Sequence, residues 1–290
     1  MSFHPKQAKR PIQIRVIEGE GERRITYERF DFPDGQPHIK LSDVIDGCDV
    51  SLRAAITSPD DLFELLMLKD ILDAGLNRVM LHITYLMGAR MDRRIDFLQP
   101  HTLAIVCDAL RDAEFDMIEI LDPHSNYARD FIYSPRTPVH TLYPEEQVHE
   151  ILGQYAPTKT RVVIPDAGAE ERVLKVTMDT PFKNYIRCTK ERDSETGKLS
   201  HFTITNPADV NGMVCLIIDD ICDGGRTFEG IAALLRDAGA TGVDLFVTHG
   251  IFSRGGKLAG IDFVYTTDSY PGRRDNVITL PLDTTKEPTE

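Results

Sequence analysis

The sequence predicts an α/β fold with two domains, each a mostly parallel β-sheet flanked by helices. The chain has 290 residues, a length typical of two domains. Apolar runs and helical patterns alternate in β-α-β-α-β order through the first half, and this order is typical of parallel sheets. Prolines cluster at Pro135, Pro138 and Pro144, and a second set of βα patterns follows them. We therefore expect domains at residues 1–140 and 141–290.

The first half begins with β-branched and alternating positions over residues 12–57, with a turn at 33–35, which predicts short strands. Ser58 and Pro59 precede two acids, a combination that predicts the start of a helix. Gly75 suits the end of that helix. The remaining patterns predict a strand at 78–83, a polar loop at 88–99, a helix at 100–115 and a strand at 117–121.

The second half opens with a predicted helix at 144–155 and a strand at 161–165. Residues 172–205 predict further strands, broken by a polar loop at 190–198. An apolar strand at 213–218 is followed by a helical pattern from Phe228 to Gly239. Strands at 243–248, 261–265 and 277–280 complete the set, and the acidic tail from Asp283 is expected to be loose.

The composition is that of a soluble globular protein, with 41% apolar and 27% charged residues. The net charge of −13 argues against nucleic-acid binding, and a phosphorylated substrate would need local cations or Mg²⁺. The five cysteines are an odd number without a CxxC pair, which favours a reducing, cytoplasmic setting. No run has transmembrane length, so we expect no membrane partner.

The segment Val214–Thr227 carries the most chemical information. An apolar run ends in Asp219 and Asp220, at the strand end where open α/β sheets bind ligands. A Gly-Gly-Arg-Thr turn and a helical pattern follow, and backbone N–H groups at a helix start form an anion site. Acids for hydroxyl groups beside amides for a phosphate predict a sugar-phosphate site.

Four other segments extend this pattern: Tyr85–Arg93 (Tyr-Leu-Met-Gly-Ala-Arg-Met-Asp-Arg), Asp122-Pro-His-Ser125, Pro165-Asp-Ala-Gly168 and Thr248-His-Gly-Ile-Phe-Ser253. The ordered set resembles the ribose-phosphate diphosphokinase (PRPP synthetase) family, whose fold is of the type I phosphoribosyltransferase class. The resemblance implies two phosphoribosyltransferase-like domains, with ATP on the N-terminal side and ribose phosphate on the C-terminal side.

The resemblance also implies a reaction, in which an Mg²⁺-dependent diphosphotransferase moves a diphosphate from ATP to the C1 hydroxyl of ribose 5-phosphate. The products are PRPP and AMP. His124 and Asp166 match the family's metal ligands, and Lys190 and Arg192 match the cations of its mobile catalytic loop, with His124 also catalytic. The residues at the family's ATP-binding positions are Phe32, Asp34, Gln36, Arg90, Met91 and Asp92. The residues at the family's ribose-phosphate positions are Asp219, Asp220, Asp223, Gly224, Gly225, Arg226 and Thr227. Since Phe32 and its neighbours match a segment that reaches the adenine of another subunit, a homo-oligomer, dimer or hexamer, is implied.

The chain departs from the family pattern at several of these positions. Gln36 and Met91 replace a glutamate and a glutamine of the ATP site. Ile95-Asp-Phe-Leu-Gln99 replaces a basic segment that in many relatives helps to bind an allosteric ADP or phosphate. We therefore expect weak or absent regulation of that kind.

The phosphate turn departs as well, because Gly224 stands where the family has a threonine, and Arg226 adds a positive charge. A more open turn suits a phosphate that continues into another group, as in ADP-ribose, so the same reaction on ADP-ribose in NAD metabolism is an alternative. Ribose 5-phosphate is slightly preferred. A non-catalytic nucleotide-binding or associated subunit is an alternative of another class, and a salvage phosphoribosyltransferase is a third.

Overall fold

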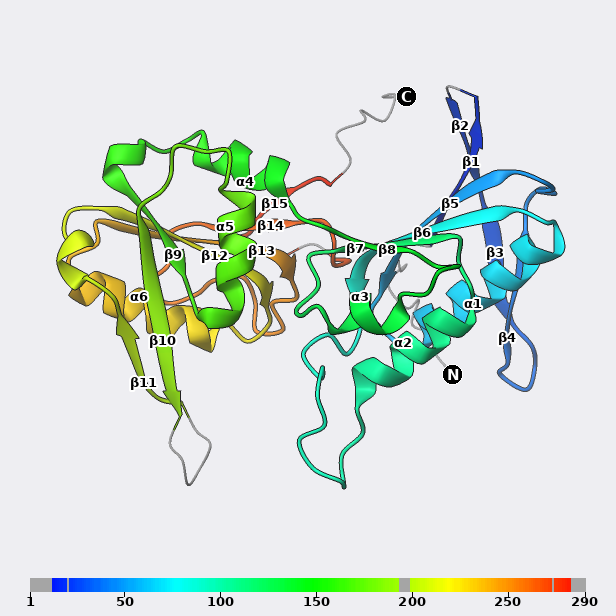
Figure 1. Ribbon diagram of the computed structural model, residues 1–290, viewed down its shortest axis with the longest axis horizontal. Helices are drawn as coiled ribbons and strands as arrows, with labels where there is room; N and C mark the ends of the chain where they lie inside the picture. The colour runs from blue at the N-terminus through cyan, green and yellow to red at the C-terminus, as the bar shows by residue number, and fades with distance from the viewer. Residues whose placement is uncertain (1–11, 20, 193–198, 273, 283–290) are drawn as a thin grey trace. The chain divides into compact units, whose positions relative to one another are not determined.

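The computed structural model describes residues 12–19, 21–192, 199–272 and 274–282. The chain divides into two compact units, Met1–Leu142 and Tyr143–Glu290 (Figure 1). Among the helices in the described ranges, none has the length and apolar character needed to cross a membrane.

Unit 1 is built on a six-stranded sheet in the order β2-β1-β5-β6-β7-β8. Its strands are β1 (Gln13–Glu18), β2 (Gly21–Ile25), β5 (Asp49–Ile56), β6 (Arg78–Leu86), β7 (Met117–Leu121) and β8 (Val139–Leu142). Strands β5 to β8 are parallel, whereas β1 is antiparallel to both β2 and β5. The parallel arrangement predicted from the βαβαβ order is confirmed. A separate hairpin joins β3 (Tyr27–Asp31) to β4 (Pro37–Leu41).

Helices α1 (Pro59–Ala74), α2 (Thr102–Asp112) and α3 (Tyr127–Ile132) lie on one side of this sheet (Figure 1). Helix α1 begins as predicted, because the Ser58 hydroxyl accepts a hydrogen bond from the Asp61 amide at 3.3 Å. Gly75 ends it for a different reason from the one predicted. Its φ is −88°, and a Cβ there would lie 2.2 Å from the Ile45 carbonyl oxygen, so close packing excludes a side chain. Helix α3 and strand β8 were not predicted.

Unit 2 is built on a seven-stranded sheet in the order β11-β10-β9-β12-β13-β14-β15. Its strands are β9 (Thr160–Ile164), β10 (Tyr185–Arg192), β11 (Leu199–Ile204), β12 (Val214–Cys222), β13 (Gly242–Gly250), β14 (Val264–Thr267) and β15 (Ile278–Leu280). Among the described residues of this sheet, β11 pairs antiparallel with β10, and the other strand pairs are parallel. The predicted tail from Asp283 lies outside the described residues.

Helices cover both faces of the unit 2 sheet. Helix α6 (Arg226–Asp237) packs on one face through a core that includes Ile217, while α4 (Glu145–Leu152) and α5 (Glu170–Val176) pack on the other through a core that includes Leu216 and Ile218. Burial on both faces explains why β12 is continuously apolar from Val214 to Ile218, whereas β5 alternates. Short 3₁₀ turns occupy η1 (Pro157–Lys159), η2 (Ala167–Ala169) and η3 (Pro207–Asp209).

Two predictions for residues 172–205 are wrong in part. Residues up to Val176 belong to helix α5, whose first turn carries Glu170 and Glu171, as suits a helix start. The strand β10 also continues to Arg192, into the segment predicted as a polar loop. The rest of that loop, residues 193–198, lies outside the described residues.

Candidate active site

The acids of the sugar-phosphate motif lie inside the end of β12 and not after it. Asp219 and Asp220 are followed in the same strand by two more residues, Ile221 and Cys222. Their side chains are 13% and 4% exposed, so both carboxyl groups are largely removed from water. Burial of two adjacent acids is costly unless a cation or a hydrogen-bond donor compensates.

Arg172 is that cation, and sequence reasoning missed it. Its guanidinium lies 3.6 Å from Asp219 Oδ1 and 3.6 Å from Asp220 Oδ2, and its side chain is only 8% exposed. The residue belongs to α5, a helix that the sequence analysis treated as strand. The available signal was its position six residues after Asp166. A helix that begins shortly after Asp166 places Arg172 next to the adjacent strand β12.

The acids remain crowded despite Arg172. Burial raises the pKa of Asp219 well above its usual range, and the negative charge of Asp220 raises it further. The guanidinium of Arg172 acts in the opposite direction, while Asp166 adds a third raising influence. A ligand that brings hydroxyl donors or a cation to these carboxylates therefore relieves a repulsion already present in the unit.

Asp166 reaches this cluster from the turn after β9. Its backbone is extended, and its Oδ1 accepts a hydrogen bond from the Ala169 amide at 3.1 Å, which caps η2. The same oxygen would lie 3.3 Å from a Cβ on Gly168, so the glycine allows the turn to close around the carboxylate. The predicted residues Asp166, Asp219 and Asp220 are thus brought together within unit 2.

The glycine turn connects β12 to α6. Gly225 has a φ of 76°, in the left-handed region, and a Cβ there would lie 2.3 Å from Leu258 Cδ2. Both facts demand glycine at this position. Arg226 is the first residue of α6 and is exposed, while Asp223, Gly224 and Thr227 are half-buried. The turn therefore places backbone N–H groups at the start of a helix, next to the acids.

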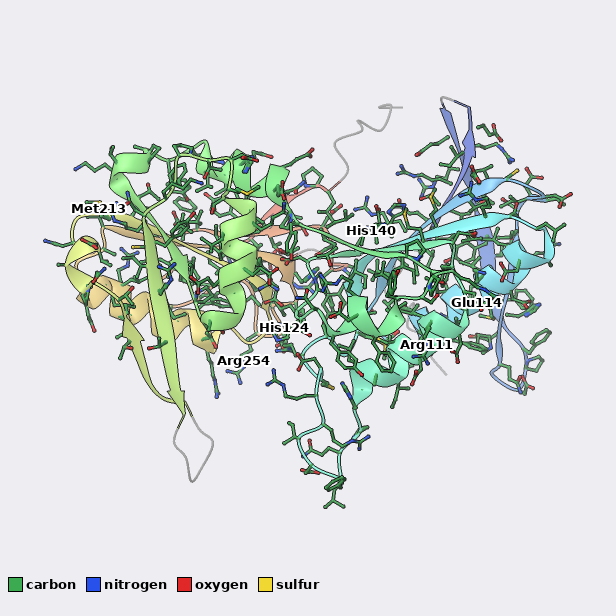
Figure 2. All side chains as sticks on the ribbon, in the orientation of Figure 1. Arg111, Glu114, His124, His140, Met213 and Arg254 are labelled. Carbon is green, nitrogen blue, oxygen red and sulfur yellow. The ribbon has the colours of Figure 1, made fainter. Side chains whose placement is uncertain are left out.

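In unit 1 the structure brings together two of the predicted segments. Asp92 is 11% exposed and accepts a hydrogen bond from Arg93 Nε at 3.1 Å. Burial acts to raise the pKa of Asp92, but Arg93, Ser125 and the charge of His124 outweigh it, so that pKa is lowered. His124, labelled in Figure 2, therefore lies near Asp92. Arg90 and Met91 precede Asp92 with exposed side chains.

The other predicted ATP residues form a second group on the β3–β4 hairpin. Gly35 has a φ of 85°, and Asp34 Oδ1 accepts the Gln36 amide at 3.1 Å, so the turn is closed from within. The Phe32 side chain is 48% exposed, with its ring 5.4 Å from Phe30 and 5.6 Å from His38. Figure 1 shows this hairpin away from the segment between β6 and α2 that carries Arg90–Asp92.

The roles predicted for the metal ligands His124 and Asp166 and for the cations Lys190 and Arg192 stay predictions. His124 belongs to unit 1 and Asp166 to unit 2, so their pairing stays a prediction. Within the described residues, no group of three or more His, Cys, Asp or Glu side chains forms a ready-made metal centre. Lys190 and Arg192 lie on β10, with a register irregularity between Glu191 and Arg192, and their side chains are outside the described part.

Comparisons with known proteins cover most of the chain. The family model described as Phosphoribosyl transferase domain matches residues 171–271, which include Arg172 and the β12–α6 motif. A ribose-phosphate pyrophosphokinase from Hyphomonas neptunium is 29% identical over 249 residues, covering 85% of this chain and 78% of the relative. Another, from Rhodopirellula baltica, is 30% identical over 257 residues, covering 86% of this chain and 79% of the relative.

The fold agrees with a solved structure as well. The crystal structure of phosphoribosylpyrophosphate synthetase from Mycobacterium smegmatis superposes with a TM-score of 0.74 at 23% identity, covering 88% of this chain and 86% of the other. This similarity confirms the predicted α/β class of phosphoribosyltransferase-type domains. Because the alignments with the curated relatives extend through both units, the chain belongs to the ribose-phosphate pyrophosphokinase family.

Proposed function

We propose that this protein transfers a diphosphate group from ATP to the C1 hydroxyl of ribose 5-phosphate, giving PRPP and AMP. The observation that carries the proposal is the pair of acids Asp219 and Asp220, with Arg172 as their cation, beside the glycine turn in a chain of this family. Its relatives bear the name ribose-phosphate pyrophosphokinase, which favours ribose 5-phosphate over ADP-ribose and favours an enzyme over a binding subunit.

The acceptor sugar would bind at the carboxyl end of β12. Asp219 and Asp220 would accept hydrogen bonds from the ribose hydroxyls, which relieves the repulsion between the two carboxylates. The turn from Asp223 to Thr227 would hold the 5-phosphate through its N–H groups and the positive end of α6. These contacts leave the C1 hydroxyl to face the donor.

The residue types proposed as metal ligands suit Mg²⁺. His124 and Asp166 would provide one nitrogen and one oxygen, a sparse set that suits an ion that keeps several waters and binds substrate phosphates. When bound, the ion would neutralise charge on the triphosphate and so favour attack at the β-phosphorus. Arg90 and Asp92 would position the triphosphate, and the Phe32–Gln36 hairpin would contact the adenine.

Lys190 and Arg192 would act on the transferring group. Two cations near the end of a hairpin suit a segment that closes over bound substrates and neutralises a loose phosphoryl transition state. Lys190→Ala should then lower kcat by roughly 10²–10³-fold and leave the dissociation constant of ribose 5-phosphate nearly unchanged. Equal losses in turnover and in sugar binding, measured by steady-state kinetics and calorimetry, would remove this role.

AMP release is the direct test of the reaction. The protein is incubated with ATP and Mg²⁺ and with either ribose 5-phosphate or ADP-ribose, and nucleotides are separated by chromatography. We expect AMP and PRPP with ribose 5-phosphate, and less AMP with ADP-ribose. No AMP with either acceptor would contradict the enzymatic proposal and favour a nucleotide-binding subunit.

Regulation and assembly follow from the same proposal. The segment Ile95–Gln99 should support no allosteric ADP site, so ADP at fixed ribose 5-phosphate should inhibit competitively with ATP; non-competitive inhibition would contradict this.

If the Phe32 hairpin serves a neighbouring subunit, light scattering should give a dimer or hexamer. We also infer a cytoplasmic setting, supported by five cysteines that are all free thiols.

A further inference from the structure

A second segment of unit 2 is fixed against the glycine turn. The amides of Ile251 and Phe252 both donate to the Cys222 carbonyl oxygen, at 2.8 and 3.1 Å, directly before the turn. The Leu258 side chain lies over Gly225, where a Cβ would come within 2.3 Å of it. Residues 251–258 are thus tied to the turn by hydrogen bonds at one end and by packing at the other.

Arg254 occupies a tight turn in the middle of this segment. The Gly255 amide donates to the Phe252 carbonyl oxygen at 2.8 Å, which closes a four-residue turn around Arg254. Phe252 is buried, and Arg274 Nε holds the Ile251 carbonyl at 2.8 Å. The backbone that carries Arg254 is therefore restrained on both sides, and only its side chain extends freely.

The Arg254 side chain lies beside Gly224, the residue of the phosphate turn that lacks a side chain (Arg254 is labelled in Figure 2). Its Cδ and Nε lie 4.0 and 3.9 Å from the position that a Cβ of Gly224 would take. Arg254 is exposed, and neither it nor Arg226 forms an ion pair with any residue that the structure describes. Two uncompensated guanidinium groups therefore flank one anion-binding turn in a chain of net charge −13.

We propose that Arg254 is a phosphate-binding residue of the acceptor site, and that it donates hydrogen bonds to the 5-phosphate held at Gly224–Thr227. This inference rests on the proposed function. A guanidinium binds phosphate with two parallel N–H donors, which adds geometric specificity to the charge. The backbone turn supplies N–H groups to the phosphate, and the Arg254 guanidinium would contact it from the side where Gly224 lacks a side chain.

Equilibrium binding to purified variants tests the proposal. Calorimetry measures the affinity of Arg254→Gln for ribose 5-phosphate and for unphosphorylated ribose, in Mg²⁺ and a non-hydrolysable ATP analogue. We expect about 10- to 100-fold weaker binding of ribose 5-phosphate, as for one lost charged hydrogen-bonding pair. Ribose affinity should stay within about twofold, because ribose has no phosphate to contact. Arg254→Lys should recover part of the loss, since it keeps the charge and loses the planar fork.

Lys257→Gln is the matched control. It removes the same charge three residues away in the same segment, from an exposed side chain. We expect unchanged affinity for both sugars. Wild-type-like binding of ribose 5-phosphate by Arg254→Gln, or an equal loss in Lys257→Gln, would overturn the assignment. So would a wild-type protein that binds no ribose 5-phosphate. A wild-type protein that binds it but releases no AMP would contradict only the proposed reaction.

Discussion

Buried acids lie at both ends of the unit 2 sheet, and their surroundings differ in kind. Asp244, near the start of β13, accepts hydrogen bonds from the Tyr155 hydroxyl at 2.6 Å and the Phe263 amide at 3.1 Å. Asp219, near the end of β12, has another acid as its neighbour and an arginine at 3.6 Å. Both have a raised pKa, first of all through burial.

After burial, the next largest influence on the pKa differs between Asp219 and Asp244. Tyr155 and Phe263 lower the pKa of Asp244 by hydrogen bonding to its carboxylate, whereas Asp220 raises that of Asp219. An acid compensated by neutral donors at short distance stabilises the fold by itself. An acid crowded by a like charge gains from a ligand that brings hydrogen-bond donors or a cation, which is typical of functional sites.

The largest effect on stability should follow from removal of Arg172. Arg172→Met would leave Asp219 and Asp220 buried without their cation, and we expect a loss of about 3–5 kcal/mol in the free energy of unfolding at neutral pH. The loss should shrink as the pH falls, because protonation of the acids removes the repulsion. Urea denaturation at several pH values measures it.

Arg187→Met is the control for this change. Arg187 pairs with Glu170 at 2.8 Å, but these side chains are 45% and 39% exposed, so solvent screens the pair. Its removal should cost less than about 1 kcal/mol. Equal losses in the two variants would mean that Arg172 contributes no more to stability than an exposed ion pair does, and would contradict its role as the cation that compensates the two buried acids.

Next in size is a pair of matched substitutions at the two acids. Asp219→Asn should lower kcat/KM for ribose 5-phosphate by about 10- to 100-fold, through loss of a charged hydrogen bond. Its stability relative to wild type should rise with pH. The sign follows because a raised folded-state pKa makes ionisation oppose folding as pH rises from the unfolded pKa towards the folded one. An asparagine lacks that ionisation.

Asp244→Asn should show the converse behaviour. Activity should stay within about threefold, and the free energy of unfolding should fall by about 1–3 kcal/mol, because the hydrogen bonds from Tyr155 and Phe263 to a charged carboxylate are lost. Urea denaturation and steady-state kinetics on both variants decide the matter. An Asp244→Asn variant that is stable but inactive would contradict the division into structural and ligand-binding acids.

The same contrast explains how far the sequence could be interpreted. Asp219 and Asp220 were predictable, because a continuous apolar run that ends in acids marks the carboxyl end of a buried parallel strand. Arg172 was missed, since its spacing from Asp166 is a weak signal, seven residues make a short helix with little periodicity, and its ion pairs join distant segments. Gly75 was placed correctly, but its physical reason, the approach of Ile45, is a tertiary contact.

Contacts between side chains on different strands or loops were also not predicted, because they join residues that are far apart in the sequence. Arg254 lies 30 residues after Gly224 in the sequence, and only the parallel pairing of β12 with β13 brings their loops together. The Tyr155–Asp244 hydrogen bond joins residues 89 apart. Local patterns give the position and type of most elements, whereas the partners of a buried charge depend on the packing of whole strands and helices.

The smallest effect should come from Tyr155→Phe, which removes one donor from Asp244 and leaves the other. We expect a loss of about 1–2 kcal/mol at neutral pH, with activity retained. The loss should diminish as the pH falls through the raised pKa of Asp244, because a protonated carboxyl no longer needs the phenol as a donor.

Tyr185→Phe is the matched control for this last prediction. The Tyr185 hydroxyl lies 2.9 Å from Thr177 Oγ1, so it bonds a neutral group, and its removal should cost stability equally at every pH. Urea denaturation of both variants across the acidic range separates the two cases. A pH-independent loss in Tyr155→Phe would show that Asp244 is not compensated as a charge, and that the amino end of the sheet holds its acid in the neutral form. The contrast with Asp219 would then rest on the close pairing of Asp219 with Asp220, and not on donors to a charged Asp244.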